Sequence, residues 1–421
     1  MTRRTTPSKS NGRRSGSWLL MMIALVIGVP AAILAEIAIH SSQLTQHQNQ
    51  RAVVSEAASP VRFPANVSVR NSAGPVPRPA GPNGFFPGWW VSQDAGYMVQ
   101  SDGSGGRLLT TQDGGKSWTT AIPLTYGHTF QRDMSFPDQT HGFVVSVSPE
   151  GQRLVPHLWA SYAPAKWQQR VLPASEAVDG IDFIDGSTGF VLFNSIDGPR
   201  VYSTSDGGQS WMLVAQKNGF VAQDHLEGMR FLNARTGWIG GWRPVGATQG
   251  SAASPLLYMT EDGGQTWHVQ ILPVAFSAAS SVQSSRQRVS YIDPPHFYND
   301  REGVAAATIG SKQEARITTY RTHDGGHSWQ TAQVLPQGAE AWSSAQPDVT
   351  WTGAGSQVQL ARGASEATSS VPVSNLPEQR RLLAVQFVDA SVGVAQGYSD
   401  QTKDVRTYRT TDGGRSWTRI L

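Results

Sequence analysis

An eight-residue pattern, T-x-D-G-G-x-[ST]-W, occurs five times and restricts the possible fold more than any other feature of the chain. Its copies run from Thr111 to Trp118, Thr204 to Trp211, Thr260 to Trp267, Thr322 to Trp329 and Thr410 to Trp417. The pattern has the chemistry of a hairpin turn, because Asp can accept backbone N–H bonds and the two glycines adopt conformations that are costly for other residues. Trp covers the turn with apolar surface. We therefore interpret its Asp and Trp as structural residues: Asp113, Trp118, Asp206, Trp211, Asp262, Trp267, Asp324, Trp329, Asp412 and Trp417.

A second pattern, F-x-[DN]-x-x-x-G, alternates with the first. It begins at Phe136, Phe183, Phe231, Phe297 and Phe387, and Trp90 to Gly96 is a degenerate copy. We expect the aromatic residue to end an inner strand, the Asp or Asn to turn the chain, and Gly to open the next strand.

The spacing of this second pattern gives the number of repeats. Its aromatic positions lie 46, 47, 48, 66 and 90 residues apart, so the fourth interval holds an insertion and the last holds two units. The unit without a clear motif is expected around Trp342 to Ala361. Units of about 47 residues with four short strands are typical of propeller blades. The sequence therefore predicts an all-β fold, a seven-bladed β-propeller of four-stranded blades, over residues 89–421.

One N-terminal transmembrane helix is predicted at residues 18–39, before the propeller. Trp18 to Ala35 is an uncharged, mostly apolar run, and Ile37 to Ile39 extends it. Basic residues precede the run, which places residues 1–17 in the cytoplasm and the propeller outside. No A-x-A cleavage site follows, which favours an uncleaved signal anchor over a removed signal peptide. Residues 40–88, rich in Pro, Ser and Gln, are expected to form a spacer.

Composition excludes several classes of function. The net charge of +3 includes five basic residues within the first 16, which leaves −2 for the remainder and no basic excess for nucleic acid. The chain has no cysteine, so disulfides, thiolate catalysis and Cys-ligated zinc are excluded. His323 and His327 lie in one turn and do not have the spacing of a metal site. We expect no cofactor and no metal.

The two motifs together resemble the Asp-box (BNR-repeat) β-propeller superfamily over residues 89–421. That superfamily includes sialidases, xyloglucan-active glycoside hydrolases, the sortilin ectodomain and the photosystem II assembly and stability factors, and the pairing of both motifs in short blades looks most like the last group. This resemblance implies an extracytoplasmic scaffold that helps a membrane complex assemble. The chain departs from that group in its transmembrane anchor, and the photosystem partner is not carried over.

Strand order predicts where a partner would bind. The five Asp boxes should share one face with the F-x-[DN] turns, whereas two insertions, Arg243 to Ser254 and Val274 to Ser290, should emerge together on the opposite face. Loops on a rigid scaffold often carry function. The candidate partner-binding residues are Arg243, Phe276, Gln283, Arg286 and Arg288. The alternative interpretation is that both loops are tolerated insertions.

Enzymatic alternatives have weaker support. A sialidase needs a Tyr nucleophile and three arginines, and the segment Val61 to Pro64 resembles its opening motif only loosely. Glu176, Asp179 and Asp182 are candidate carboxylates for a xyloglucanase-like glycosidase, but nothing marks a pair. We therefore expect a non-catalytic, membrane-anchored protein that binds a protein partner, with cell-surface carbohydrate binding or hydrolysis as the alternative.

Overall fold

The computed structural model describes most of the chain from residue 88 onward. The described ranges are 88–101, 106–124, 133–150, 153–162, 166–195, 197–216, 219–221, 223–245, 252–273, 288–311, 316–335, 339–346, 349–362 and 371–421. All of them fall within one compact unit, Pro60–Leu421. The predicted cytoplasmic head, transmembrane helix and spacer lie outside the described residues, apart from Gly88. Within the described ranges, no helix combines the length and apolar character needed to cross a membrane.

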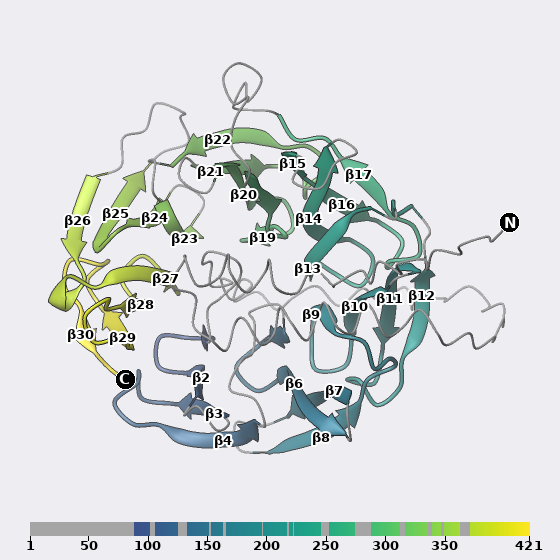
Figure 1. Ribbon diagram of the computed structural model, residues 1–421, viewed down its shortest axis with the longest axis horizontal. Helices are drawn as coiled ribbons and strands as arrows, with labels where there is room; N and C mark the ends of the chain where they lie inside the picture. Colours follow the sequence, from purple (N-terminus) through teal and green to yellow (C-terminus); the bar gives the residue numbers. More distant parts are fainter. Residues whose placement is uncertain are drawn as a thin grey trace, which may run out of the picture. The chain divides into compact units, whose positions relative to one another are not determined.

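The described strands form antiparallel four-stranded units in which consecutive strands pair, and the units follow one another around a common centre (Figure 1). We number the units in chain order and letter their strands A to D from the centre outward. Unit 1 contains β1 (Gly88–Trp90), β2 (Gly96–Ser101), β3 (Gly106–Thr111) and β4 (Thr119–Leu124). Unit 2 contains β5 (Met134–Ser135), β6 (Gly142–Glu150), β7 (Arg153–Ser161) and β8 (Trp167–Val171). Unit 3 contains β9 (Val178–Phe183), β10 (Gly189–Ser195), β11 (Gly198–Thr204) and β12 (Met212–Gln216).

Units 4 and 5 share one ten-stranded sheet. Unit 4 contains β13 (His225–Phe231), β14 (Gly237–Val245), β15 (Ala252–Pro255), β16 (Leu257–Thr260) and β17 (His268–Gln270). Unit 5 contains β18 (Arg288–Ile292), β19 (His296–Phe297), β20 (Gly303–Ser311), β21 (Arg316–Thr322) and β22 (Gln330–Val334). In unit 4, β15 and β16 together form strand C; in unit 5, β18 and β19 together form strand A.

Units 6 and 7 are again separate four-stranded sheets. Unit 6 contains β23 (Ala339–Gln346), β24 (Val349–Ala354), β25 (Gln357–Arg362) and β26 (Val371–Asn375). Unit 7 contains β27 (Arg381–Phe387), β28 (Gly393–Tyr398), β29 (Val405–Thr410) and β30 (Thr418–Arg419), preceded by the short turn η4 (Pro377–Gln379). Units 2 and 6 are complete although their Asp boxes are eroded. The described residues therefore form an all-β fold of the propeller type.

The second sequence motif marks the A–B turn, as predicted. Strand A ends at the motif aromatic residue in β1, β9, β13, β19 and β27, and strand B opens at the motif glycine. Glycine is required because the aromatic ring lies against it: a Cβ on Gly189 would be 2.4 Å from Phe183 Cδ1, and one on Gly237 would be 2.5 Å from Phe231 Cδ1. The pattern therefore pairs a large ring with the one residue that leaves room for it.

Neighbouring units are joined by stacked aromatic rings. The residue after a motif glycine stacks on the motif aromatic residue of the next unit in the pairs Phe143–Phe183 (centroids 3.4 Å apart) and Phe190–Phe231 (3.5 Å), and Trp351, on β24 of unit 6, stacks on Phe387 (3.9 Å). All six of these side chains are buried. Burying aromatic rings contributes most of the apolar area of such an interface, so the motif positions hold neighbouring units together.

The ring closes between units 1 and 7, and among the described strands no sheet contains strands of both units. Gln386 Oε1 accepts the Trp90 N–H (2.9 Å), and Gln386 Nε2 donates to the Trp90 carbonyl (3.0 Å). Farther from the centre, Trp118 Nε1 donates to the Ile420 carbonyl (3.2 Å). Closure therefore depends on side chains and not on a continuous strand ladder.

Candidate interaction face

Each Asp box is closed by its own carboxylate. Asp206 Oδ1 accepts the backbone N–H groups of Gln209 and Ser210 (both 2.9 Å) and the Thr204 hydroxyl (2.8 Å), and Oδ2 accepts the Ser210 hydroxyl (2.6 Å). The same carboxylate bonds recur at the other four boxes. In each, the Asp accepts bonds from the Thr two residues before it and from the Ser or Thr four residues after it: Asp113, Asp262, Asp324 and Asp412. The box carboxylates are thus occupied by their own turns.

Hydrogen bonding also lowers the pKa of these carboxyl groups. Bonds from the Ser117 side chain and backbone lower the pKa of Asp113 from about 3.8 to about 2. At Asp206, burial alone would raise the pKa, but the bonds from Ser210 and Thr204 outweigh it and lower the value to about 2. The turns therefore stabilise the ionised form.

Backbone bonds place the boxes and the A–B turns on the same face, as strand order predicts. The first box glycine donates to a carbonyl of the A–B turn in its own unit in five cases: Gly114 to Asp94, Gly207 to Ser187, Gly263 to Arg235, Gly325 to Arg301 and Gly413 to Ser391, at 2.7–3.0 Å. We call this side the box face. The B–C turns and the D–A links lie on the opposite side, which we call the linker face.

On the linker face, charged pairs fix D–A links to the unit that follows. Glu176, in the link before β9, pairs with Arg200 on β11. Asp224, in the link before β13, pairs with Arg243 on β14. Arg380, in the link before β27, pairs with Asp404 in the B–C turn of unit 7. This face is therefore held in place by specific contacts in units 3, 4 and 7.

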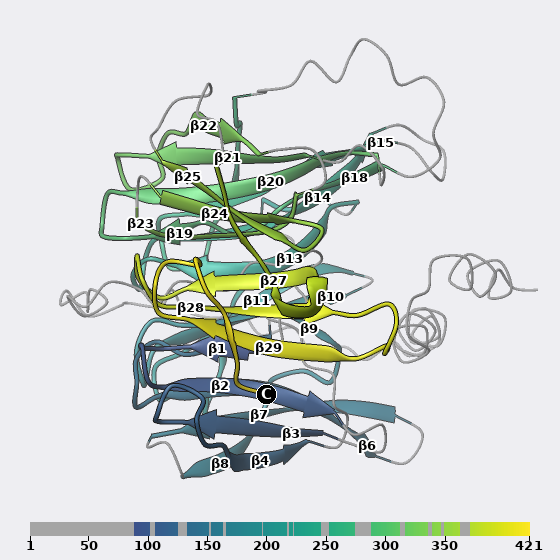
Figure 2. The same ribbon diagram turned by 90° about the vertical axis from the view of Figure 1, so that its left-hand side faces the viewer.

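The two predicted insertions meet on this face. The segment from Arg243 to Ser254 was expected to be a loop, but its arms are strands: Arg243 is opposite Ser254 and Val245 is opposite Ala252 in the β14–β15 ladder. The second insertion ends in β18, which pairs with β20 from Arg288 to Ile292 and bridges to β14 at Gly241. We use the name insertion platform for β15, β18 and the residues of β14 and β20 that pair with them, Gly241–Val245 and Ala307–Ser311. The platform projects to the right in Figure 2.

Two glycines allow this junction between units 4 and 5. A Cβ on Gly240 would be 2.3 Å from the Ile292 carbonyl oxygen, and one on Gly241 would be 2.0 Å from the His225 carbonyl oxygen. Any side chain at these positions would push β14 away from β18 or from β13. The glycine pair therefore permits β14 to contact its own strand A and that of the next unit at once.

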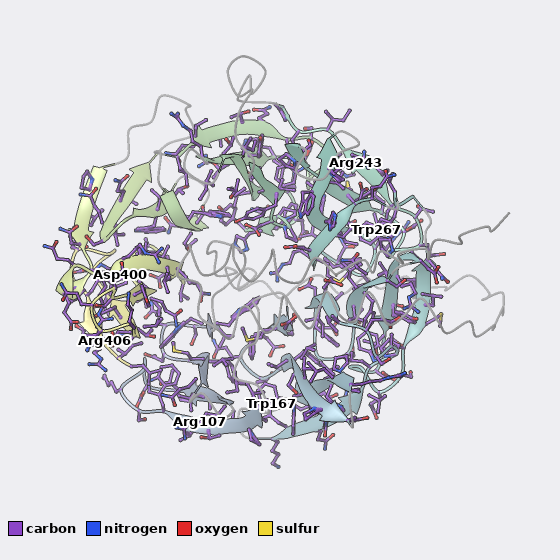
Figure 3. The ribbon with its side chains drawn as sticks, viewed as in Figure 1. Arg107, Trp167, Arg243, Trp267, Asp400 and Arg406 are labelled. Atoms are coloured by element: carbon purple, nitrogen blue, oxygen red, sulfur yellow. The ribbon has the colours of Figure 1, made fainter. Side chains whose placement is uncertain are left out.

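Arg243, a predicted partner-binding residue that is labelled in Figure 3, is largely engaged by contacts within the protein. Its Nε and Nη2 donate to Asp224 Oδ1 (2.6 Å) and Oδ2 (2.8 Å), and Tyr258 donates its hydroxyl to Oδ2 (2.6 Å). The Asp224 side chain is fully buried, whereas that of Arg243 is 36% exposed. Bonding to Asp224 raises the pKa of Arg243, and burial raises the pKa of Tyr258 to about 12. Arg243 therefore anchors the base of the insertion platform.

The other candidates are only partly placed. Arg288 begins β18, on the insertion platform. Phe276, Gln283 and Arg286 lie outside the described residues.

Next to Arg243, Trp242 stacks on His225 with centroids 3.8 Å apart and planes 4° apart, and the His225 side chain is exposed. This aromatic pair is a surface feature that the sequence did not indicate, because it depends on the register between β13 and β14.

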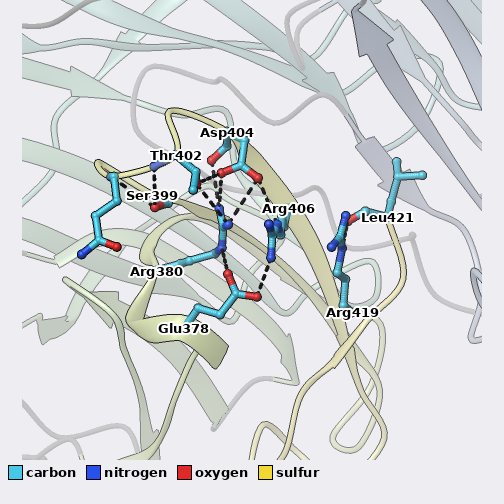
Figure 4. A network of polar contacts seen from close by, with 9 residues as sticks. Glu378, Arg380, Ser399, Thr402, Asp404, Arg406, Arg419 and Leu421 are labelled. Carbon is cyan, nitrogen blue, oxygen red and sulfur yellow. Dashed lines mark hydrogen bonds and ion pairs between the residues drawn. The ribbon is translucent and has the colours of Figure 1, made fainter.

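Unit 7 carries a closed network of four charges on the linker face (Figure 4). Arg380, which is buried, donates to Asp404 Oδ1 (2.9 Å) and Glu378 Oε2 (3.0 Å). Arg406 donates to Asp404 Oδ2 (2.9 Å) and to Glu378 Oε1. Within the described ranges, the non-glycine residues with positive φ are Glu378 (57°), Gln379 (51°) and Lys403 (54°), and all three lie here. Because each charged side chain contacts one of opposite charge, the network fixes the strained backbone of the B–C turn of unit 7 and of the link before β27.

The carboxylates considered for glycoside hydrolysis have separate partners. Glu176 pairs with Arg200, Asp179 accepts the Asn194 N–H (2.9 Å), and Asp182 accepts the Phe231 N–H (2.6 Å). His323 and His327 likewise contact different carboxylates, Glu302 (2.6 Å) and Glu261 (3.6 Å). Each of these side chains is thus engaged in a contact of its own.

Comparisons with known proteins identify the fold. No family model matches the chain, and no curated protein matches it. Among solved structures, YCF48 bound to D1 peptide matches with a TM-score of 0.47 and 14% identity, covering 84% of this chain and 99% of that chain. YCF48 from Cyanidioschyzon merolae matches with a TM-score of 0.37 and 16% identity, covering 82% and 85%. The polysaccharide lyase PL25, an ulvan lyase, matches with a TM-score of 0.50 and 10% identity, covering 82% and 96%. The likeness to the lyase concerns the fold alone, and it agrees with the propeller described above.

Proposed function

We propose that this chain is a non-catalytic scaffold, held outside the membrane by residues 18–39, that binds a protein partner through the insertion platform. Each four-stranded unit is taken as one blade, which gives a seven-bladed propeller. The pairing of Asp boxes with F-x-[DN] turns supports placing it among the Asp-box propellers, near the photosystem II assembly factor group. A role in assembling or stabilising a membrane or envelope complex follows from that resemblance.

One observation carries the proposal: the described ends of both insertions, residues 243–245, 252–254 and 288–290, belong to a single sheet. A tolerated insertion would be expected to extend into solvent without pairing. Here β18 pairs with β20 over five residues, β14 bridges to β18, and a buried carboxylate fixes the base of the hairpin. Rigid presentation of added segments is what a binding surface requires, because ordering them on binding would cost affinity.

The test is affinity purification of the tagged full-length protein from gently solubilised native membranes. A variant with residues 246–251 replaced by Asn-Gly keeps Arg243 and the β14–β15 ladder and removes only the tip of the hairpin. The matched control replaces Gly151-Gln152, in the B–C turn of unit 2, by Asn-Gly. Retention of a defined membrane-complex subunit by wild type and control, and its loss from the variant, supports the proposal.

Carbohydrate binding is the second candidate, and the stacked pair of Trp242 and His225 favours it. An aromatic face on the protein surface can stack against the apolar face of a sugar ring, and Arg243 and Glu227 lie nearby in sequence to offer polar contacts. If no protein is retained from native membranes, and a glycan array shows binding that Trp242→Ala abolishes, this second function replaces the first.

A further inference from the structure

The junctions between neighbouring units, which we call seams, are not packed alike. Five seams contain a pair of stacked aromatic rings, one from each unit: Tyr97–Phe136, Phe143–Phe183, Phe190–Phe231, Trp238–Phe297 and Trp351–Phe387. At the other two seams, the residue after the motif glycine is aliphatic: Val304 in unit 5 and Val394 in unit 7. The chain itself crosses the seam between units 5 and 6. The seam between units 7 and 1, which we call the closing seam, joins the two ends of the ring without such a link.

The apolar cluster at the closing seam is small. Its buried members are Trp90, Ala384 and Val394. The cluster that joins units 3 and 4 has twelve buried members and includes the Phe190–Phe231 stack. Apolar burial is the main favourable term in holding packed surfaces together, so the closing seam gains much less from it.

Polar side chains fill the rest of the closing seam. Gln386, which hydrogen-bonds to the Trp90 backbone, is fully buried, and Gln396 and Thr407 are each 3% exposed. Thr407 donates its hydroxyl to Met98 Sδ across the seam (3.3 Å). Gln396 Oε1 is buried and accepts no hydrogen bond within the described residues. When the seam opens, water can bond to these amide and hydroxyl groups, which offsets part of the cost of opening.

Two further contacts across the closing seam lie at the surface of the protein. Gln93 Nε2 donates to Asp389 Oδ2 (2.7 Å), and Arg409 Nη2 donates to the Gln93 carbonyl (3.0 Å). Both contacts are exposed, and exposed polar contacts contribute little to stability because water replaces them. These bonds therefore align the two units but do not make up for the small apolar cluster.

We infer that the closing seam is a conformational device: the ring opens and recloses there while the other six seams stay closed. Opening separates unit 1 from unit 7 and leaves unit 1 attached to unit 2 by the chain. The open ring presents an indole ring and two primary amides that the closed ring buries: those of Trp90, Gln386 and Gln396. This inference does not depend on partner binding by the insertion platform.

Thiol labelling of single-cysteine variants of the full-length protein tests the inference, because the chain itself has no cysteine. Met98→Cys reports on the closing seam. The matched control is Val191→Cys, at the same position of strand B in unit 3, where Val191 belongs to the apolar cluster shared by units 2 and 3. Both positions are buried in the closed ring. Without denaturant, we expect a maleimide to react at least about tenfold faster at position 98 than at position 191. Equal rates, or faster labelling at position 191, would overturn the inference.

Hydrogen exchange of crosslinked variants provides a second measurement that leaves the buried part of the seam unchanged. Gln93→Cys with Asp389→Cys is joined across the closing seam by a short bis-maleimide. The control joins Glu261→Cys to His327→Cys, whose native side chains meet between units 4 and 5 (3.6 Å). Each variant is compared before and after crosslinking. We expect the first crosslink to slow exchange about tenfold in β1, β2, β28 and β29, and the control to leave it unchanged there. Slowing by both crosslinks or by neither would contradict a seam that opens by itself.

Discussion

At the scale of single residues, one carboxylate organises each Asp-box turn. Asp206 accepts four hydrogen bonds from three residues, Thr204, Gln209 and Ser210. The two glycines that follow it have φ of 71° and 88°, in the left-handed region that glycine tolerates. The pattern could be interpreted correctly from the sequence because all of these contacts are local.

Removing that carboxylate should destabilise the fold without affecting binding directly. For Asp206→Ala we expect the free energy of unfolding to fall by about 1–2 kcal/mol, because backbone N–H groups lose their acceptor. The measurement is chemical denaturation followed by fluorescence. Asp300→Ala, at an exposed position, is the control and should change stability by less than about 0.5 kcal/mol. Equal effects of the two substitutions would contradict the structural role.

Stability should also depend on pH through these turns. The pKa of Asp113, Asp206, Asp324 and Asp412 is lowered to about 2. A lowered pKa in the folded state means that the ionised groups stabilise the protein above their ordinary pKa near 3.8, and that this stabilisation is lost as the pH falls through about 2. We expect the denaturation midpoint to fall across this window. Asp206→Asn should show a shallower decline than wild type; an unchanged slope would contradict the assignment.

At the scale of elements, the insertion hairpin depends on one ion pair. Arg243→Ala would leave the buried Asp224 carboxylate with the Tyr258 hydroxyl but without its cation. We expect a loss of about 2 kcal/mol, less than for a wholly buried pair because Arg243 is 36% exposed. Hydrogen exchange should accelerate in β15 before other strands. Arg243→Ala combined with Asp224→Asn should recover part of the loss, since no unpaired charge remains.

The same element shows where sequence-based prediction ends. The A–B turns, the box face and the position of the insertions could be predicted from the repeats. Each of these depends on residues close in sequence or on the alternating direction of consecutive strands. The pairing of β14 with β18 depends on residues 51 positions apart, Gly241 and Ile292, and no local pattern specifies it. Arg243 was predicted as a partner-binding residue, and its ion pair with Asp224 could be found only from the register of unit 4.

The exposure of several aliphatic side chains was also beyond the sequence, because aliphatic residues in a strand are ordinarily assigned to the core. Exposure, and not residue type, distinguishes Val171 and Ile271 from the buried Ile122.

At the scale of the whole molecule, the propeller should fold without its predicted anchor. Its described contacts lie within residues 88–421, and both ends of the ring contribute complete sheets. We expect a chain lacking residues 1–40 to be a soluble, folded monomer with one cooperative β-type melting transition. Sedimentation and circular dichroism provide the measurement. Aggregation or a gradual loss of signal would show that the N-terminal part is needed for folding.

Closure of the ring by side chains makes one interface more vulnerable than the others. Gln386 is fully buried and makes two hydrogen bonds to the Trp90 backbone, which joins the first unit to the last. For Gln386→Ala we expect a loss of about 2–3 kcal/mol, because both buried Trp90 groups lose their partner. The matched control is Ser343→Ala, which removes the equivalent bond to the Phe387 N–H between two units that are adjacent in sequence. Units 6 and 7 remain connected by the chain when that bond is lost, whereas units 1 and 7 do not. Hydrogen exchange should therefore rise first in β1 to β4 and β27 to β30 for Gln386→Ala, and a pattern shared with the control would contradict the closure proposed for this ring.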